Sequence, residues 1–354
     1  MIYEHDQMKT IVSPHHSLHA LDIEFSAGRA QPCFEKPSRV DMVIKQIRER
    51  ELGEILQPNK FPLKHITQVH TPDYIDFLET CWAEWEACFG PENNAMASVF
   101  FRPDQRHRIP KHIEGKLGFY SGDLTAGLGP HSWEAIRSSV DSALTGADCI
   151  LQGERAAFSL CRPAGHHASG AQMAGYCYVN NAAVVAQYFH ELGKEKVAIL
   201  DVDYHHGNGT QSIFYERDDV YFASIHGDPN QEYPYYLGHA DEIGSGVGEG
   251  FNLNIPLPLG ATGWADYRRA LEICLEKLAS YDPDVLVVSL GVDTYENDPI
   301  SHFKLQSEDF SDMGRLIESA KIPTLFVFEG GYGVESLGLN TVNVLDSFKH
   351  AASR

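Results

Sequence analysis

The chain has 354 residues, of which 43% are hydrophobic and 22% are charged, and this composition excludes a disordered or fibrous protein. Its 49 acidic residues against 28 basic ones give a formal net charge of −21, which opposes binding to the phosphates of nucleic acids and favours cationic partners. No apolar run reaches the length of a membrane span, and the N-terminus lacks the pattern of a signal peptide, so we expect a cytoplasmic protein without membrane contact.

Seven cysteines occur at irregular spacing. An odd number without a regular pattern argues against a disulfide framework, and no CxxC or Cys/His finger pattern points to a structural zinc module. We therefore expect reduced thiols.

Strand-like and helix-like segments alternate along the chain. Apolar positions recur at helical spacing over 133–151 and 264–278, and Asn180-Asn181 caps a predicted helix that ends at Gly193. Short runs that are apolar on both faces predict strands at 156–162, 197–203, 220–226, 284–293 and 324–332. This order predicts an α/β fold in one domain, residues 1–354, with a central, mostly parallel sheet and helices on both faces.

Residues 81–113 interrupt this alternation. They are rich in aromatic residues, contain proline and show little periodicity. Long insertions in compact domains tend to be functional, so we expect a loop at the rim of the active site or at a subunit contact, the alternative being an ordinary surface loop.

Ionisable residues crowd the end of the predicted strand in "ILDVDYHHGNGT" (199–210). Residues two apart on a strand share a face, so Asp203 and His205 are expected side by side, able to hold one cation. Asp293 ends another strand, where open α/β sheets place their ligands. Two carboxylates and an imidazole with an open position are typical of a catalytic zinc site.

Two further clusters also follow predicted strands. His166 and His167 lie in a Pro-Gly turn and suit general acid–base catalysis beside a metal. Tyr332 follows Gly330-Gly331, and its hydroxyl could stabilise an oxyanion. Each cluster alone has an ordinary structural explanation, but their joint occurrence at strand ends favours an active site.

Five segments together resemble the zinc-dependent deacetylases of the arginase/histone deacetylase superfamily, and within it the bacterial acetylpolyamine amidohydrolases. They are "RPAGHHA", "GYCYVNNAA", "DVDYHHGNGTQ", "SLGVDTYENDP" and "EGGYG". The resemblance covers nearly the whole chain. It implies one Zn²⁺ per subunit bound by Asp203, His205 and Asp293, and catalytic roles for His166, His167 and Tyr332, with His167 as general base and later acid.

The resemblance also implies a surrounding shell. Asp201 would orient His166, whereas Asn208 leaves His167 without an anionic partner, which should lower the pKa of His167. Structural K⁺ would occupy two sites, the first formed by Asp201, Asp203, His205, Ser224 and Ile225, and the second near Phe214, Arg217 and Val220.

The same resemblance implies the substrate contacts. Tyr176 and Tyr233 match the aromatic walls of a tunnel for an acylated alkylamine, Gly175 and Ile300 match further substrate-binding positions, and Glu114 matches an acidic residue of the rim. A second acidic rim position falls on Thr125, with Asp123 close by, which favours short diamines over the longest polyamines. The insertion at 81–113 would narrow the entrance through a homodimer contact.

We therefore expect removal of acetyl groups from acetylputrescine, acetylcadaverine or possibly acetylspermidine, releasing acetate and a free amine. Deacetylation of acetyl-lysine in proteins is the alternative. An arginase-like two-metal site would need further carboxylates where Gly-Asn-Gly follows His206, and a sensor without catalysis would be expected to have lost Tyr332 or the histidine pair.

Overall fold

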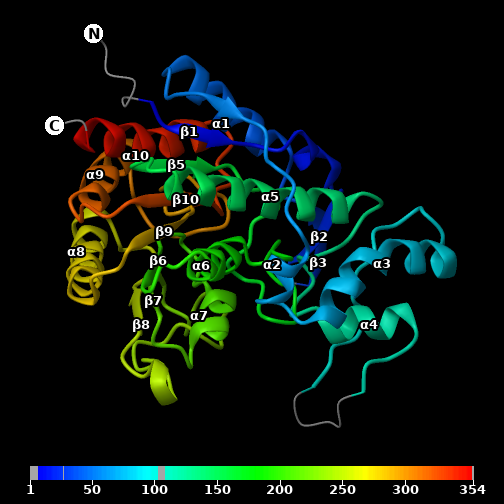
Figure 1. Cartoon of the computed structure of the whole chain (residues 1–354). Helices are drawn as coiled ribbons and strands as arrows, with labels where there is room; N and C mark the ends of the chain where they lie inside the picture. Colours follow the sequence, from blue (N-terminus) through cyan, green and yellow to red (C-terminus); the bar gives the residue numbers. More distant parts are fainter. Residues whose placement is uncertain (1–6, 27, 103–107, 353–354) are drawn as a thin grey trace.

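The computed structural model describes residues 7–26, 28–102 and 108–352. Figure 1 shows one central sheet between layers of helices. In space the strand order is β4-β1-β5-β10-β9-β6-β7-β8, and each pairing between neighbours in this sheet is parallel. The predicted α/β fold with a mostly parallel sheet is therefore confirmed.

The five predicted strands are present; four are shorter than expected, and β7 extends one residue further. They are β5 (Ala156–Ser159), β6 (Val197–Asp201), β7 (Val220–Gly227), β9 (Val285–Leu290) and β10 (Thr324–Phe328). Sequence reasoning missed β1 (Lys9–Ile11), β4 (Ile55–Leu56) and β8 (Asn252–Leu257), and also a separate antiparallel hairpin of β2 (Ile23–Ser26) and β3 (Arg29–Pro32). The edge strands are too short or too polar to give an apolar run.

Helices cover both faces of the sheet. The predicted helices are α5 (Ser132–Leu151), α6 (Asn181–Glu191) and α8 (Trp264–Tyr281), and the side chain of Asn180 caps α6 as expected. The others are α1 (Ser38–Glu49), α2 (Lys64–Thr67), α3 (Pro72–Phe89), α4 (Ile113–Tyr120), α7 (Asn208–Phe214), α9 (Ser307–Glu318) and α10 (Leu337–Ala352), with short 3₁₀ helices at Pro14–Leu18 and Gly246–Gly248.

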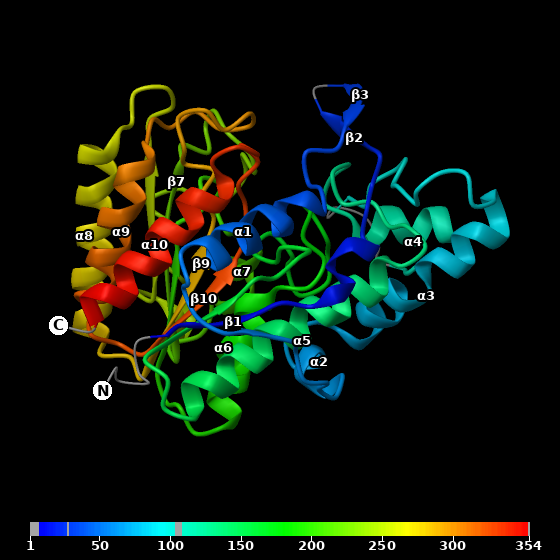
Figure 2. The same cartoon turned by 90° about the horizontal axis from the view of Figure 1, so that it is seen from above.

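Alternate residues of each strand enter opposite cores, because successive side chains of a strand point to opposite faces. Val285 and Val287 of β9 pack in the core formed with α3, α4, α5 and α6. Leu286 and Val288 pack in the other core, with α1, α8, α9 and α10. Figures 1 and 2 show α8, α9 and α10 together on one side of the sheet. Of the helices described, none is long and apolar enough to span a membrane.

The insertion differs from the expected loop in its first part. Residues 81–89 form the last turns of α3, where Trp85 packs on Phe89 with ring centroids 4.5 Å apart. Residues 103–107 lie outside the described part, and Ile113 begins α4. Figure 2 shows α3 and α4 side by side at one end of the molecule, with the β2–β3 hairpin standing out from the body. The contact between Trp85 and Phe89, four residues apart, stabilises the last turns of this helix.

Candidate active site

Asp203, His205 and Asp293 meet beyond the carboxyl ends of β6 and β9, which are neighbours in the sheet. One ligand atom of each lies within 4.8 Å of the other two. His205 Nδ1 lies 3.4 Å from Asp203 Oδ1 and 3.0 Å from Asp293 Oδ2. The structure thus brings together the three residues that the sequence singled out.

The alternation of side chains along a strand, which predicts Asp203 and His205 side by side, is the wrong explanation for their proximity. β6 ends at Asp201, and the chain then turns through a loop. The Asp203 amide donates to Asp201 Oδ1 and the His205 amide donates to Asp203 Oδ1, at 3.1 and 2.9 Å. Side chains that accept from the amide two residues later fix this loop, so its geometry depends on turn chemistry.

The trio fits a divalent cation. Asp203 and Asp293 are fully buried, and burial together with the Asp203 charge raises the pKa of Asp293 to about 7. Two adjacent buried carboxylates repel unless a cation compensates them. A Cβ atom at Gly291 would lie 1.9 Å from Asp203 Oδ2, and one at Gly330 would lie 2.6 Å from Asp293 Oδ2. The backbone therefore leaves room for the carboxylates and little else, and their oxygens with an imidazole nitrogen are ligands that Zn²⁺ accepts.

The histidine pair lies in the turn between β5 and α6, and each ring has a different partner. His166 Nδ1 donates to Asp201 Oδ2 at 3.0 Å, and the predicted contact is present. Burial alone would lower the pKa of His166, but Asp203 and Asp201 outweigh it and raise that pKa to about 10. These two carboxylates therefore favour the protonated form of His166.

His167 has a neutral partner. Its Nδ1 lies 2.7 Å from Asn208 Oδ1, at the first residue of α7. Burial, then the neighbouring His166 and His205, lower the pKa of His167 well below its ordinary value. With its proton on Nδ1 donated to the amide oxygen, His167 keeps Nε2 as a free base. Such a group can accept a proton from water.

Tyr332 lies in the turn after β10 and stays protonated. Burial raises its pKa well above the ordinary value, although Arg39 opposes this. The Arg39 guanidinium lies 4.7 Å from the centre of the Tyr332 ring, and it also donates to the carbonyls of Gly331 and Glu329. The Tyr332 amide donates to Asp298 Oδ2 at 2.7 Å. These contacts fix a hydroxyl donor at the cavity.

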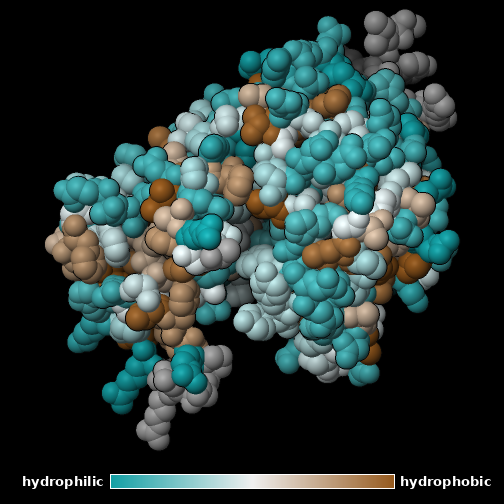
Figure 3. Space-filling view, turned by 180° about the vertical axis from the view of Figure 1, so that it is seen from behind, coloured by the Kyte–Doolittle hydropathy of each residue, from teal (hydrophilic) through white to brown (hydrophobic). Residues whose placement is uncertain are grey.

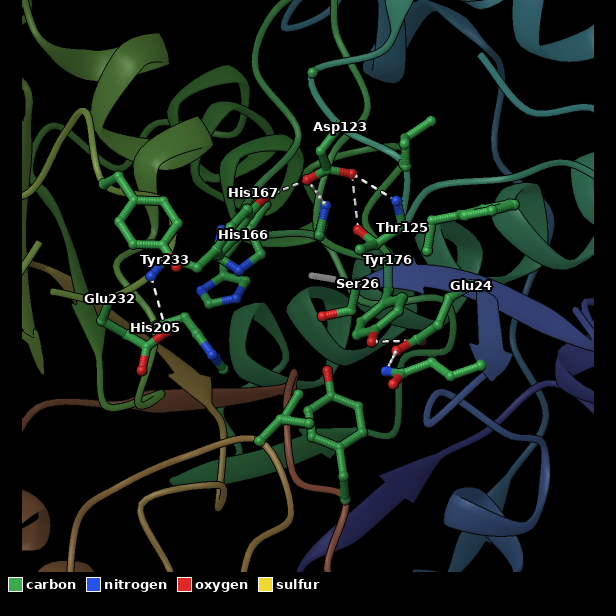
Figure 4. Close-up of a pocket in the computed structure, with 18 of the residues that line it drawn as sticks. Glu24, Ser26, Asp123, Thr125, His166, His167, Tyr176, His205, Glu232 and Tyr233 are labelled. Carbon is green, nitrogen blue, oxygen red and sulfur yellow. Dashed lines mark hydrogen bonds between the residues drawn. The ribbon is translucent and has the colours of Figure 1, made fainter. Parts of the chain in front are cut away.

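One cavity of about 580 Å³ joins these groups. His166, His167, His205 and Tyr332 line it, as do four predicted substrate-binding residues, Gly175, Tyr176, Tyr233 and Ile300. Figure 4 shows three carboxylates around it, from Glu24, Asp123 and Glu232. Among the described lining residues there is no lysine or arginine. The cavity is therefore lined by negative charge beyond the histidines.

Of the predicted rim residues, Thr125 and Asp123 lie at the cavity, whereas Glu114 does not. Glu114 is not among the residues that line the cavity, is exposed, and accepts a hydrogen bond from Ser98 at 2.6 Å. Thr125 and Asp123 do line it. Asp123 Oδ2 accepts from the Tyr233 hydroxyl at 2.7 Å and from the Gly175 amide at 3.0 Å, so this carboxylate links one predicted wall, Tyr233, to the backbone at Gly175.

The residues predicted for K⁺ lie along β7 and the segment before it. Ser224 and Ile225 are buried in β7 beside Asp201, and Ser224 Oγ lies 2.8 Å from His226 Nδ1. Phe214 ends α7, Val220 begins β7, and the Arg217 guanidinium stacks on the Phe214 ring at 5.0 Å. Binding of K⁺ at either place stays a prediction.

Sequence reasoning missed three contributors: Glu24, Arg39 and Glu232. Glu24 lies in an unpredicted hairpin, Arg39 in α1, and Glu232 in the loop after β7. None belongs to a recognisable motif, although a glutamate within a short run of β-formers could have drawn attention to Glu24.

Groups that can bind a cation, move a proton and donate a hydrogen bond thus lie together at one cavity, an arrangement that suits a hydrolase. The chain belongs to the histone deacetylase domain family, whose model matches residues 33–348. It is 50% identical to acetylpolyamine amidohydrolase 1 of Pseudomonas aeruginosa over 98% of this chain and 100% of that one. It is 46% identical to the acetylpolyamine amidohydrolase of Mycoplana ramosa over 96% and 98%.

A solved structure agrees with this relationship. The crystal structure of the acetylpolyamine aminohydrolase from Burkholderia pseudomallei superposes with a TM-score of 0.93 at 37% identity, covering 98% of this chain and 99% of that one. The resemblance drawn from the five motifs is confirmed, and this protein is an amide hydrolase of the deacetylase family.

Proposed function

We propose that this enzyme removes the acetyl group from N-acetylated diamines and short polyamines, such as acetylputrescine and acetylcadaverine, with zinc as its metal. The observation that carries the proposal is the cavity lined by the carboxylates of Asp123 and Glu232, with no lysine or arginine among its described lining residues. A low-dielectric cavity of one sign concentrates ligands of the opposite sign. The names of the similar proteins support the same substrate class.

The proposed chemistry uses three groups of the chain. A zinc ion held by Asp203, His205 and Asp293 would supply Lewis acidity. His167 Nε2 accepts the proton of the attacking water, and the Tyr332 hydroxyl donates to the oxyanion that develops on the acetyl carbonyl. His167 then returns the proton to the leaving amine, while Asp201 accepts from His166 Nδ1 and favours the protonated form of that neighbouring ring.

A turnover comparison tests the substrate. We expect kcat/KM for acetylcadaverine to exceed that for an acetyl-lysine peptide by at least about tenfold. A peptide must place its backbone at the entrance of the cavity, whereas a diamine has no backbone to place there. N-hexylacetamide, which has a methyl group in place of the ammonium, serves as the uncharged control. A preference for the peptide would assign the enzyme to protein deacetylation instead.

We also propose a homodimer through the insertion, structural K⁺ at the two predicted places, and a cytoplasmic location. Support for the dimer comes from exposed apolar side chains on this segment, namely Phe89, Val99, Phe100 and Ile109. Figure 3 shows hydrophobic side chains gathered over this part of the molecule. Light scattering of the protein and of a Phe89→Glu, Val99→Glu double variant tests the dimer, and a monomeric mass for the unsubstituted chain would contradict it.

A further inference from the structure

Glu24 is the only residue of β2 that is buried. It is 1% exposed, whereas its neighbours Ile23 and Phe25 are 42% and 38% exposed. An acid pointing inward while apolar residues point outward reverses the usual arrangement of a strand. Burying a carboxylate is costly unless hydrogen bonds compensate it, so the position needs an explanation beyond packing.

Three neutral donors surround the Glu24 carboxylate. The Tyr176 hydroxyl donates to Oε2 at 2.7 Å and the Phe34 amide donates to the same oxygen at 3.3 Å. The Gln31 side chain donates to Oε1 at 2.8 Å. Figure 4 shows Tyr176 and Glu24 joined by their hydrogen bond beside the cavity. Gln31 and Phe34 fix the position of the Glu24 carboxylate. The hydrogen bond from the Tyr176 hydroxyl to this carboxylate therefore restrains the Tyr176 side chain.

Tyr176 is held in an unusual conformation. Its backbone is left-handed, with φ of +62°, which a bulky residue adopts only where its surroundings enforce it. Its ring packs on that of Tyr332 with centroids 5.6 Å apart, and Leu21 and Cys33 at the base of the hairpin complete the cluster. The ring thus lies between the Glu24 anchor and the tyrosine that donates to the carbonyl.

We propose that Glu24 is a positioning residue for amide hydrolysis, holding the Tyr176 ring as a fixed wall of the cavity next to Tyr332. The hairpin β2–β3 is then part of the active site, because it supplies the acceptor that the wall requires. This inference rests on the proposed hydrolysis of a linear amide and is independent of whether that amide carries an ammonium group.

Direct attraction of a substrate ammonium by Glu24 is the competing role. The geometry favours positioning, because the carboxylate is buried and three donors already occupy it. Burial raises the pKa of the Tyr176 hydroxyl well above its ordinary value, with Glu24 adding to the effect, so this hydroxyl remains a donor across the working pH range.

The test compares Glu24→Ala, Glu24→Gln, Tyr176→Phe and the Glu24→Ala, Tyr176→Phe double variant on acetylcadaverine and N-hexylacetamide. We expect Glu24→Ala and Tyr176→Phe each to lower kcat/KM about tenfold on both substrates, mainly through KM, since a displaced wall weakens ground-state and transition-state binding alike. The double variant should be no worse than either single variant. Glu24→Gln should stay within twofold of the parent, since an amide oxygen still accepts from Tyr176.

A loss confined to the cationic substrate, in Glu24→Ala or Glu24→Gln, would overturn the positioning role and assign charge recognition. Tyr176→Phe at the parent rate would overturn it too. Thermal unfolding of each variant verifies folding, and Glu24→Gln with Tyr176→Phe decides the question if the alanine variant does not fold. Should the enzyme prefer an acetyl-lysine peptide, the proposed substrate fails, yet the same variants on that peptide still test Glu24.

Discussion

His167 Nδ1 lies 2.7 Å from Asn208 Oδ1, whereas His166 Nδ1 lies 3.0 Å from Asp201 Oδ2. Two adjacent imidazoles, with ring centroids 4.0 Å apart, thus have partners of different charge. The carboxylates beside His166 raise its pKa, whereas burial, then His166 and His205, lower the pKa of His167, whose partner is a neutral amide. This division assigns the electrostatic role to His166 and the basic role to His167.

Asn208→Asp should shift the pH profile. The general base must be unprotonated, so activity falls as pH drops through the pKa of His167. The lowered pKa puts this acidic limb well below pH 6.5 in the parent enzyme. A carboxylate at 208 stabilises the imidazolium, and we expect the acidic limb of kcat/KM to move to higher pH by about one unit. Asn59→Asp, on the loop after β4, adds the same charge elsewhere and should leave the profile unchanged; an unmoved limb in Asn208→Asp would argue against His167 as the base.

Tyr332→Phe should retain the metal and lose most turnover. Removing one oxyanion donor costs about 10²–10³ in kcat. Elemental analysis measures the bound zinc, and steady-state kinetics measures kcat. Tyr236→Phe is the matched control, because Tyr236 is 88% exposed and should tolerate the change. Near-parental turnover of Tyr332→Phe would remove the hydroxyl from the mechanism.

Metal removal should abolish hydrolysis. Dialysis against dipicolinate is expected to lower the rate by about 10²-fold or more, and added Zn²⁺ should restore it. Binding to the folded state alone also raises stability, so Tm should rise on adding Zn²⁺ to the stripped protein. Asp293→Asn should show neither recovery nor the rise in Tm. If the stripped enzyme keeps its activity, the assignment of the Asp–His–Asp trio is wrong.

Gly330→Ala should weaken metal binding without touching a ligand. The added Cβ would lie 2.5 Å from Asp203 Oδ2 and 2.6 Å from Asp293 Oδ2, and it would push both carboxylates apart. We expect a zinc affinity at least about tenfold lower in a competition titration with a chelator, comparable to losses from disturbing groups that orient ligands. Gly263→Ala is the control, because nothing lies within 4 Å of its Cβ. Equal zinc affinity in both variants would show that the turn accommodates the added methyl group at position 330 without displacing the two carboxylates.

Glu35→Gln should destabilise the fold. Arg162 binds Glu35 through Nε and Nη2 at 2.6 and 2.7 Å, and Arg39 binds it at 3.0 Å. Burial would raise the pKa of Glu35, but the two guanidinium groups outweigh it and lower that pKa from 4.5 to about 2. Leaving buried cations short of a partner costs about 3–5 kcal/mol. Urea denaturation at pH 7 measures this difference.

The pH dependence of that difference follows from the direction of the shift. A carboxylate whose pKa is lowered on folding contributes stability above its unfolded value of 4.5 and loses it as pH falls toward 2. The gap between parent and Glu35→Gln should therefore be constant from pH 7 to about 5 and narrow below 4.5. Glu49→Gln, at an exposed position of α1, should show no gap, and a Glu35 gap that widens in acid would contradict the ion-pair assignment.

The sequence by itself determined the central strands of the sheet and the reactive groups. Buried parallel strands must be apolar on both faces, so β6, β7, β9 and β10 are visible as runs, and the ligands follow because parallel strands place their carboxyl ends at one edge. Asp203, His205, Asp293, His166, His167 and Tyr332 could therefore be singled out without coordinates, and the structure brings them to one place.

Tertiary structure alone decided the walls of the cavity. β1 and β4 have three and two residues and are defined by pairing, which no local pattern encodes. Glu24 reaches Tyr176 across 152 positions, and Arg39 reaches Gly331 across 292. Such contacts depend on how distant loops pack, and the sequence around either residue carries no periodicity that would reveal its partner. Charge and periodicity act locally along a chain, whereas the shape of a cavity is set by the whole fold.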